Sequence, residues 1–226
     1  MATTNPSSYI PKRITTDDSI TAHFSDGVVM NFSKGETIVS GIGQPEGVYL
    51  INNGFIKAYS VSHKGDGNLL LVHEAGEFIP LPWALDGAHT SGLFYEAMTN
   101  VTVIRSSKDE LRTAMGKNAW LSQEILKQAV NIITVYTQRI QVLEYRTVRG
   151  RIIGQLLYLA ERFGKNTHAG IIIDVPITHQ DIADSINMNR ETASRALELL
   201  FKEGLVGQQD HLFVVLDLPM LRSALK

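Results

Sequence analysis

Residues 177–206 constrain the fold of this chain more than any other segment does. Thr178 and Asp181 stand three positions apart, which is the spacing of a capping box at the start of a helix. Apolar residues then recur at helical spacing up to a short polar turn, after which Asn189 can cap a second helix. Gly204 can end that helix, because a residue without a Cβ adopts left-handed dihedrals at little cost. The segment therefore predicts a helix-turn-helix, with these residues buried: Ile182, Ala183, Ile186, Ala193, Ala196, Leu197, Leu200 and Phe201.

The second of these helices carries polar residues opposite its apolar stripe. Because residues four apart share one side of a helix, Arg190 lies beside Ser194. Glu191 lies beside Arg195 on the same exposed strip. A helix in the major groove of DNA reads base edges with its first turns, where Arg can bond guanine and Glu can accept from cytosine. The alternative is that Glu191 and Arg195 form only a solvated ion pair worth about 0.3 kcal/mol. The cap, the turn, the apolar faces and the glycine together favour the DNA-reading interpretation.

The sequence ITHQDIADSINMNRETASRALELL resembles the recognition motif of the CRP/FNR family of bacterial transcription regulators. The resemblance extends, more weakly, over about residues 20–220. It implies that Arg190, Glu191 and Arg195 match residues that read TGTGA-type half-sites. Ser194 matches a serine that reads TTGAT-type half-sites in another branch of the family. The family also implies RNA polymerase as a partner. The residues expected to contact the DNA backbone are Thr178, His179, Gln180 and Thr192.

Composition and charge limit the other classes of function. The chain has 226 residues and a net charge of −2, and residues 146–226 carry ten Lys and Arg against nine Asp and Glu. Affinity for phosphates must therefore come from the local placement of charge. The absence of cysteine excludes disulfides and thiolate metal or iron–sulfur sites, and no two of the seven histidines have helical ligand spacing. We therefore expect neither a metal nor a cofactor.

Two further classes are disfavoured by motifs that the sequence lacks. It contains no nucleophile elbow, P-loop or zinc ligand set, which argues against an enzyme. It has no apolar run long enough to span a bilayer, and its first residues lack the apolar core of a signal peptide. We therefore expect a cytoplasmic protein with no membrane partner.

From Phe24 to Arg105 the sequence is typical of short strands separated by glycine turns. A hairpin tip is expected at residues 63–67, followed by a returning strand at 68–73. Strand follows strand without an intervening helix, which indicates an antiparallel roll and, with the later helices, an α+β fold. The G-E-x-I and V-Y-L-I-x-x-G-x-I-K stretches are similar to the β-roll (double-stranded β-helix) of cyclic-nucleotide-binding domains. The core residues expected here are Val48, Leu50, Phe55, Ile56, Ala58 and Tyr59.

The next segment departs from the phosphate-binding cassette of cyclic-nucleotide binders. Residues 76–79 (GEFI) match it, but 80–82 (PLP) replace its Gly-Glu and 89–92 (HTSG) replace its Arg-Ser pair. No Arg or Lys occurs between Lys64 and Arg105, and a buried phosphate without a cation loses its hydration uncompensated. We therefore expect that cAMP and cGMP are not ligands. Two alternatives remain, a different small-molecule effector in the same cavity or a filled pocket. The residues expected to line it are Phe78, Leu81, Trp83, Thr90, Ser91, Tyr136 and Thr137.

One long helix is expected from Ala119 to Tyr145. A heptad seam runs along it and could pack either on the roll of the same chain or on the same helix of a second chain. Apolar residues beside the seam widen the apolar arc, so one helix can serve both surfaces. We expect a homodimer whose interface comprises Leu126, Ala129, Ile133, Tyr136, Ile140 and Leu143.

The remaining sequence surrounds the helix-turn-helix. We expect a polar hinge at 144–151, a helix over 152–163, a loop over 164–170 and a short strand over 171–175. Alternating residues around 207–211 predict a hairpin, which would make the unit a winged helix. The expected domains are a flexible tail (1–18), the β-roll (19–117), the dimerisation helix (118–145) and the winged helix-turn-helix domain (146–226).

These features lead to one main hypothesis and one alternative. The main hypothesis is a homodimeric regulator of transcription that binds double-stranded DNA at an inverted repeat, with half-sites about 34 Å apart. The alternative is a small-molecule-sensing module of the same fold whose winged helix contacts protein. The near-neutral charge of residues 146–226 favours the alternative, but that hypothesis also predicts an intact cassette, which the sequence lacks.

Overall fold

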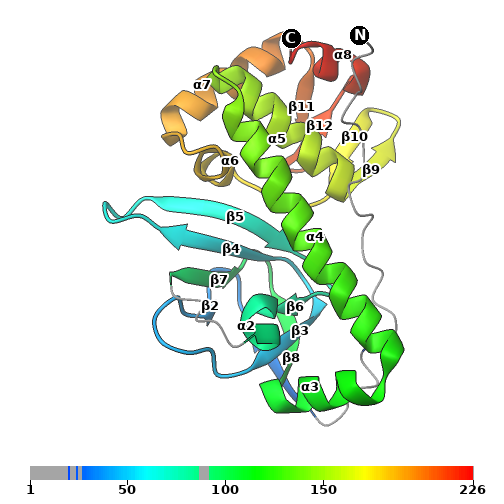
Figure 1. Ribbon diagram of the computed structural model, residues 1–226. Coiled ribbons are helices and arrows are strands. Elements are labelled where there is room, and N and C mark those ends of the chain that lie inside the picture. The colour runs from blue at the N-terminus through cyan, green and yellow to red at the C-terminus, as the bar shows by residue number, and fades with distance from the viewer. Residues whose placement is uncertain (1–19, 21–23, 25–26, 87–91, 226) are drawn as a thin grey trace, which may run out of the picture.

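The computed structural model describes residues 20, 24, 27–86 and 92–225. Its N-terminal part is a roll of two antiparallel four-stranded sheets, with strand orders β1-β8-β3-β6 and β2-β7-β4-β5 (Figure 1). The architecture confirms the predicted α+β class. The strands of the roll are β1 (Val28–Phe32), β2 (Thr37–Val39), β3 (Val48–Asn53), β4 (Ile56–Val61), β5 (Gly67–His73), β6 (Phe78–Ile79), β7 (Leu93–Ala97) and β8 (Val101–Ser106).

Side chains from both sheets meet inside the roll, as alternation along the strands predicts. Ile51 of β3 pairs with Val103 of β8, and both are fully buried. The turn after β3 depends on Gly54, whose φ of +96° suits glycine and whose added Cβ would lie 2.6 Å from the Asn100 carbonyl oxygen. Of the expected core residues, four are buried, namely Val48, Leu50, Ile56 and Ala58, while Phe55 and Tyr59 are half-buried.

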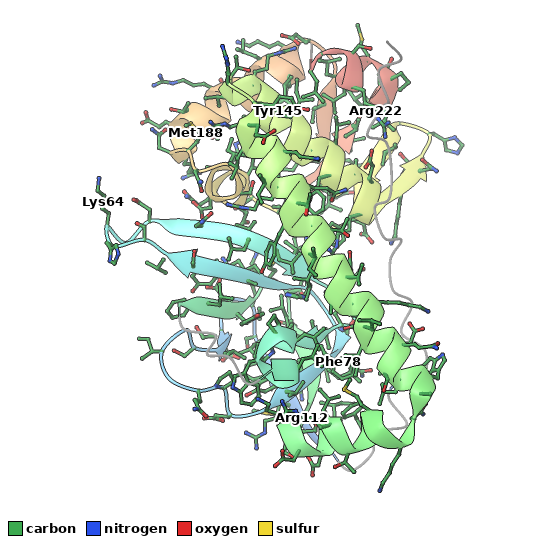
Figure 2. All side chains as sticks on the ribbon, in the orientation of Figure 1. Lys64, Phe78, Arg112, Tyr145, Met188 and Arg222 are labelled. Atoms are coloured by element: carbon green, nitrogen blue, oxygen red, sulfur yellow. The ribbon has the colours of Figure 1, made fainter. Side chains whose placement is uncertain are left out.

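The β4–β5 hairpin extends from the roll beneath α6 (His179–Ser185), which belongs to the C-terminal domain (Figure 1). Its strands are paired in register from Ile56 with His73 to Val61 with Gly67, with one irregularity. Lys64 lies at the tip and points away from the rest of the molecule (Figure 2). The hairpin tip and the returning strand were both predicted correctly.

Three helices follow or interrupt the roll: α2 (Leu81–Asp86), α3 (Lys108–Lys117) and α4 (Ala119–Glu144). α3 begins at a capping box in which Ser107 bonds the Glu110 amide and the Glu110 carboxylate bonds the Ser107 amide. α4 has 26 residues, so it is about 39 Å long at about 1.5 Å per residue. It runs from the foot of the roll to the C-terminal domain (Figure 1), and its bounds agree with the predicted long helix.

The C-terminal domain is a winged helix-turn-helix, as predicted. Its four strands form one antiparallel sheet in the order β11-β12-β10-β9. The core of the domain lies between α5, the two helices of the helix-turn-helix and this sheet, with Ile152, Ile182, Leu197 and Phe213 buried. The elements besides α6 are α5 (Val148–Phe163), β9 (Gly164–Thr167), β10 (Gly170–Ile173), α7 (Arg190–Lys202), β11 (Val206–Gln209), β12 (Leu212–Val215) and α8 (Leu218–Ser223).

Two boundaries around α5 were predicted wrongly. α5 begins at Val148 rather than residue 152, because the Thr147 hydroxyl accepts a hydrogen bond from the Gly150 amide and caps the helix. The predicted hinge is therefore shorter. Residues 164–167, predicted as part of a loop, form β9 and pair with β10. All four are exposed, so no alternation of apolar residues could reveal that strand. Within the described ranges, no helix is both long and apolar enough to cross a membrane.

Candidate nucleic-acid interface

The first helix of the helix-turn-helix, α6, begins at the predicted capping box. The Thr178 hydroxyl accepts from the Asp181 amide at 3.1 Å, and the Thr178 amide donates to the Asp181 carboxylate at 2.8 Å. The turn after α6 passes through Asn187, whose φ of +56° is a conformation that asparagine tolerates better than most residues. Met188, which Figure 2 labels at this turn, donates its amide to the Ala183 carbonyl at 3.0 Å. The turn fixes the angle between α6 and α7.

The second helix, α7, is held by its apolar face and by its two ends. Asn189 caps it by accepting from the Thr192 amide at 2.8 Å, and Gly204 follows it with a φ of +67°. Ala193, Leu197 and Leu200 are fully buried against the rest of the domain. Ala196 and Phe201 are half-buried on the same side. The predicted N-terminal cap at Asn189, the predicted stop at Gly204 and the predicted apolar stripe are therefore confirmed.

The opposite face of α7 presents its charged residues to solvent. Arg190, Glu191 and Arg195 are all exposed in the first two turns of the helix. Arg195 Nη2 lies 3.4 Å from Glu191 Oε2, with the two side chains 79% and 84% exposed. The solvated ion pair that the spacing of these residues allows is thus present. It is worth well under about 1 kcal/mol at such exposure, so it does not prevent either side chain from turning to a base edge.

Ser194 differs from these three residues, because it is half-buried and has a partner. Its Oγ lies 3.0 Å from His179 Nδ1 of α6. The imidazole stacks on Phe213 with ring centroids 5.6 Å apart and lies near Phe201. Burial and the nearby Arg190 charge lower the pKa of His179 below its ordinary value. A neutral imidazole therefore ties α6 to α7 through Ser194.

The other residues predicted to contact DNA lie around the start of α6 and α7. Thr178 is exposed, and its hydroxyl donates to Asp181 at 2.6 Å within the capping box. Gln180 is exposed and donates to Asp184 at 2.6 Å. Thr192 is half-buried beside the cap of α7. Thr178, Gln180 and Thr192 lie at the start of α6 or α7, and Arg190 begins α7. The predicted DNA-contacting residues therefore lie on one surface.

A cleft of about 780 Å³ lies between this surface and the tip of the β4–β5 hairpin. Residues 65–68 of the hairpin line one wall, and residues 187–190 of the turn line the other. Asp184 is part of the cleft, and burial, followed by neighbouring carboxylates, raises its pKa. The start of α7 therefore lines a cleft that contains one carboxylate from the roll, Asp66, and one from α6, Asp184.

The residues predicted to line an effector pocket fall into two places. Phe78 and Leu81 are each 1% exposed and belong, with Trp83, to one packed cluster at the foot of the roll (Figure 2 labels Phe78). Tyr136 is half-buried farther along α4, and Thr137 is exposed and bonds the Ile133 carbonyl at 2.9 Å. Thr90 and Ser91 lie outside the described residues. The described members do not form a single group.

Four buried polar residues that we did not predict as site residues surround the cassette. Gln128 of α4 accepts from the Phe78 amide at 3.0 Å and donates to the Gly76 carbonyl at 2.8 Å. His73, Glu77 and Arg162 form a buried hydrogen-bonded chain beside it. The only signal in the sequence was the His73–Glu77 spacing of four, and nothing in it indicated that Arg162 of the other domain would join them.

The predicted dimerisation seam lies on the face of α4 that points away from the roll. Leu126, Ile133 and Ile140 are 60–64% exposed. Ala129, Tyr136 and Leu143 are half-buried beside them. The neighbouring stripe of α4 faces the roll instead, with Leu121, Ile125, Gln128, Val135 and Val142 buried. The helix thus has two apolar faces, one covered and one open.

The fold and this surface define a class of protein, a DNA-binding transcription regulator with a sensor-like roll. The charged face of α7 is exposed, its apolar face is buried, and a long helix joins the domain to the roll.

Comparison with known proteins identifies the family. Residues 29–118 match the model of the cyclic nucleotide-binding domain, and residues 150–224 match that of the Crp-like helix-turn-helix domain. The Global nitrogen regulator of Nostoc sp. is 30% identical over 173 residues, covering 75% of this chain and 77% of that protein. The CRP-like cAMP-activated global transcriptional regulator of Mycobacterium tuberculosis is 26% identical over 170 residues, covering 74% and 75%. The structure of a CooA mutant from Carboxydothermus hydrogenoformans superposes with a TM-score of 0.77 at 17% identity, covering 91% of this chain and 90% of that one. The chain belongs to the CRP/FNR family of transcription regulators, which bind DNA through the helix-turn-helix and are not enzymes.

Proposed function

We propose that the protein is a homodimeric transcription regulator that reads an inverted-repeat operator. The observation that carries the proposal is the exposure of Arg190, Glu191 and Arg195 on the first turns of a helix whose other face is buried. A helix so placed can enter the major groove, where Arg and Glu distinguish base pairs. The open apolar strip of α4 supports the dimer, because soluble monomers rarely expose a continuous apolar patch of this kind.

Two such helices related by a two-fold axis would meet half-sites about 34 Å apart. We expect half-sites similar to TGTGA or TTGAT, since α7 carries the residues that match both patterns. Selection of bound sequences from a random duplex pool tests this. An enriched inverted repeat with one of these half-sites is the expected result, and a pool without an inverted repeat would contradict the proposal.

We further propose that cAMP does not control this regulator. Pro80 and Leu81 stand where cyclic-nucleotide binders have a ligand-holding Gly-Glu pair, and no Arg or Lys lies between Lys64 and Arg105. Leu81 is also packed into the core rather than free to bond a ligand. The M. tuberculosis relative is named for activation by cAMP, so it provides a positive control. Millimolar cAMP and cGMP should leave the midpoint of thermal unfolding of this protein unchanged, whereas a rise would show binding to the native state.

RNA polymerase as a partner and action in the cytoplasm remain parts of the same proposal. Both rest on the family to which the chain belongs. A regulator of transcription acts where the chromosome and the polymerase are. Co-purification of polymerase with the protein on an operator-containing duplex, but not with the protein alone, would support the polymerase contact.

A further inference from the structure

One buried ion pair joins the roll to the C-terminal winged helix-turn-helix domain (the DNA-reading domain). Arg162, in the last turn of α5, donates from Nη2 to Oε1 of Glu77 at 2.7 Å, although the two residues are 85 positions apart in sequence. Each residue is only 5% exposed. Most cationic side chains at protein surfaces exchange partners freely, but the Arg162 side chain is buried where the two domains meet.

Both Glu77 and Arg162 also have a second hydrogen-bond partner. His73 Nδ1 lies 2.6 Å from the other Glu77 oxygen, and Arg162 Nη1 reaches the Tyr158 hydroxyl at 3.4 Å. Burial by itself raises the pKa of a carboxyl group, but Arg162 and then His73 outweigh it and hold the pKa of Glu77 below its usual value. Glu77 is therefore ionised at neutral pH, and separating the domains would break a charge-assisted hydrogen bond.

Apolar contacts surround the ion pair and cross the same boundary. Phe55 of the roll meets Phe163 of α5 edge to face, with ring centroids 6.0 Å apart. Leu69, Val72 and Met98 of the roll belong to the same packed cluster as the helices of the DNA-reading domain. Apolar contacts tolerate small rotations, whereas a buried, hydrogen-bonded charge pair requires one geometry, so this ion pair restricts the orientation of the two domains more than the apolar contacts do.

The segment that carries Glu77 is also fixed to the long helix. Gln128 of α4 bonds the carbonyl of Gly76 and the amide of Phe78, which are the residues on either side of Glu77. Three parts of the protein thus meet at residues 76–78: the roll, α4 through Gln128 and α5 through Arg162. Any displacement of this segment changes the support of the DNA-reading domain.

We propose that Arg162 and Glu77 are positioning residues whose buried contact fixes the orientation of the DNA-reading domain on the roll. In this role Glu77, which lies in the part of the cassette that this chain keeps, holds the neighbouring domain. Neither residue touches the predicted DNA-contacting surface, so their effect on DNA reading acts through the orientation of α7.

The distance between the two domains tests the proposal directly. Because the chain has no cysteine, spin labels can be placed at a new pair, Lys64→Cys on the hairpin and Gln209→Cys in the wing, both exposed. Labelled chains are mixed with an excess of unlabelled chains so that only distances within one protomer are measured. Pulsed electron resonance should give one narrow distance distribution for the otherwise unchanged protein. Glu77→Gln and Arg162→Met should each broaden it or add a second distance.

Two further variants make the result decisive. The double variant should be no broader than the broader single variant, since both changes remove the same contact. Glu203→Gln removes the Arg149–Glu203 pair, which lies within the DNA-reading domain, and should leave the distribution narrow. Arg162→Met leaves the His73–Glu77 contact intact, so it serves if Glu77→Gln fails to fold. A folded Arg162→Met variant, with helix content unchanged by circular dichroism, that keeps the original narrow distribution would overturn the proposal.

Discussion

The polar residues of α7 differ in how firmly the protein holds them. Arg190, Glu191 and Arg195 extend into solvent, and the one ion pair among them is weak. Ser194 instead bonds His179, whose ring lies against Phe213. DNA reading by the charged residues therefore costs little reorganisation, whereas reading by Ser194 requires it to share or exchange the bond with His179.

The half-buried imidazole of His179 gives the DNA-reading domain a dependence on pH. Because the folded-state pKa of His179 lies below the ordinary value of about 6.5, the unfolded chain takes up the proton first as the pH falls. The stability that this residue contributes is present above that value and is lost as the pH falls below it. We predict that His179→Phe, which keeps the ring stack, loses less thermal stability than the unchanged protein between about pH 7.5 and about pH 5.5. Equal falls in melting temperature for both proteins would contradict the assignment.

At the scale of secondary-structure elements, α7 depends on its N-terminal cap. Asn189→Ala removes the bond to the Thr192 amide and should lower the free energy of unfolding by about 1 kcal/mol. Asn189→Asp, which can still accept that bond, should stay close to the unchanged protein. Urea unfolding followed by circular dichroism measures both, and an alanine variant as stable as the aspartate variant would show that the cap contributes nothing.

Helix ends that depend on residues close together in the sequence could be predicted. The capping box at Thr178, the cap at Asn189 and the stop at Gly204 each involve residues within one turn of one another. The position of β9 could not be predicted, because its four exposed residues gain their structure only by pairing with β10. The same distinction explains the start of α5, where a single threonine cap extended the helix into the expected hinge.

In the candidate site, too, local features could be predicted and contacts between distant residues could not. Which residues of α7 are exposed followed from helical periodicity, because the buried stripe fixes the opposite face. The contact of Arg162 with Glu77 spans 85 positions and depends on how two domains pack, which no local pattern specifies. Gln128 could not be predicted either, since one polar residue on the face of a helix that turns to the roll gives no sign of its partner.

At the scale of the whole molecule, the open face of α4 predicts how copies of the chain associate. Ile133→Glu places a charge in the middle of the exposed apolar strip and should shift the protein to monomers, because burying two like charges across a two-fold axis is costly. Lys127→Glu also introduces a carboxylate, at an exposed position outside the strip, and should leave the mass unchanged. Light scattering during size-exclusion chromatography measures both masses. A dimeric Ile133→Glu variant would place the interface elsewhere.

Polar contacts connect the roll to α6 and to α4. Lys57 of the roll pairs with Glu96 at 2.8 Å and approaches Asp181, the capping residue of α6, at 3.8 Å. Arg139 of α4 bonds Asn68 and the Leu69 carbonyl of the hairpin. The helix-turn-helix therefore rests on the hairpin of the roll, which α4 also holds, so the roll has a physical route to the DNA-reading surface.

The claim that α7 reads base sequence is tested most directly by the binding of Arg195→Ala and of the unchanged protein to two duplexes, the selected operator and a random sequence. We predict a loss on the order of 1–3 kcal/mol in binding free energy on the operator and little change on the random duplex. Arg222→Ala, which removes an arginine paired with Glu161 in α5, provides the matched control and should change neither. Equal losses on both duplexes for Arg195→Ala would show that this residue contacts only phosphate, and would contradict the claim that α7 reads sequence.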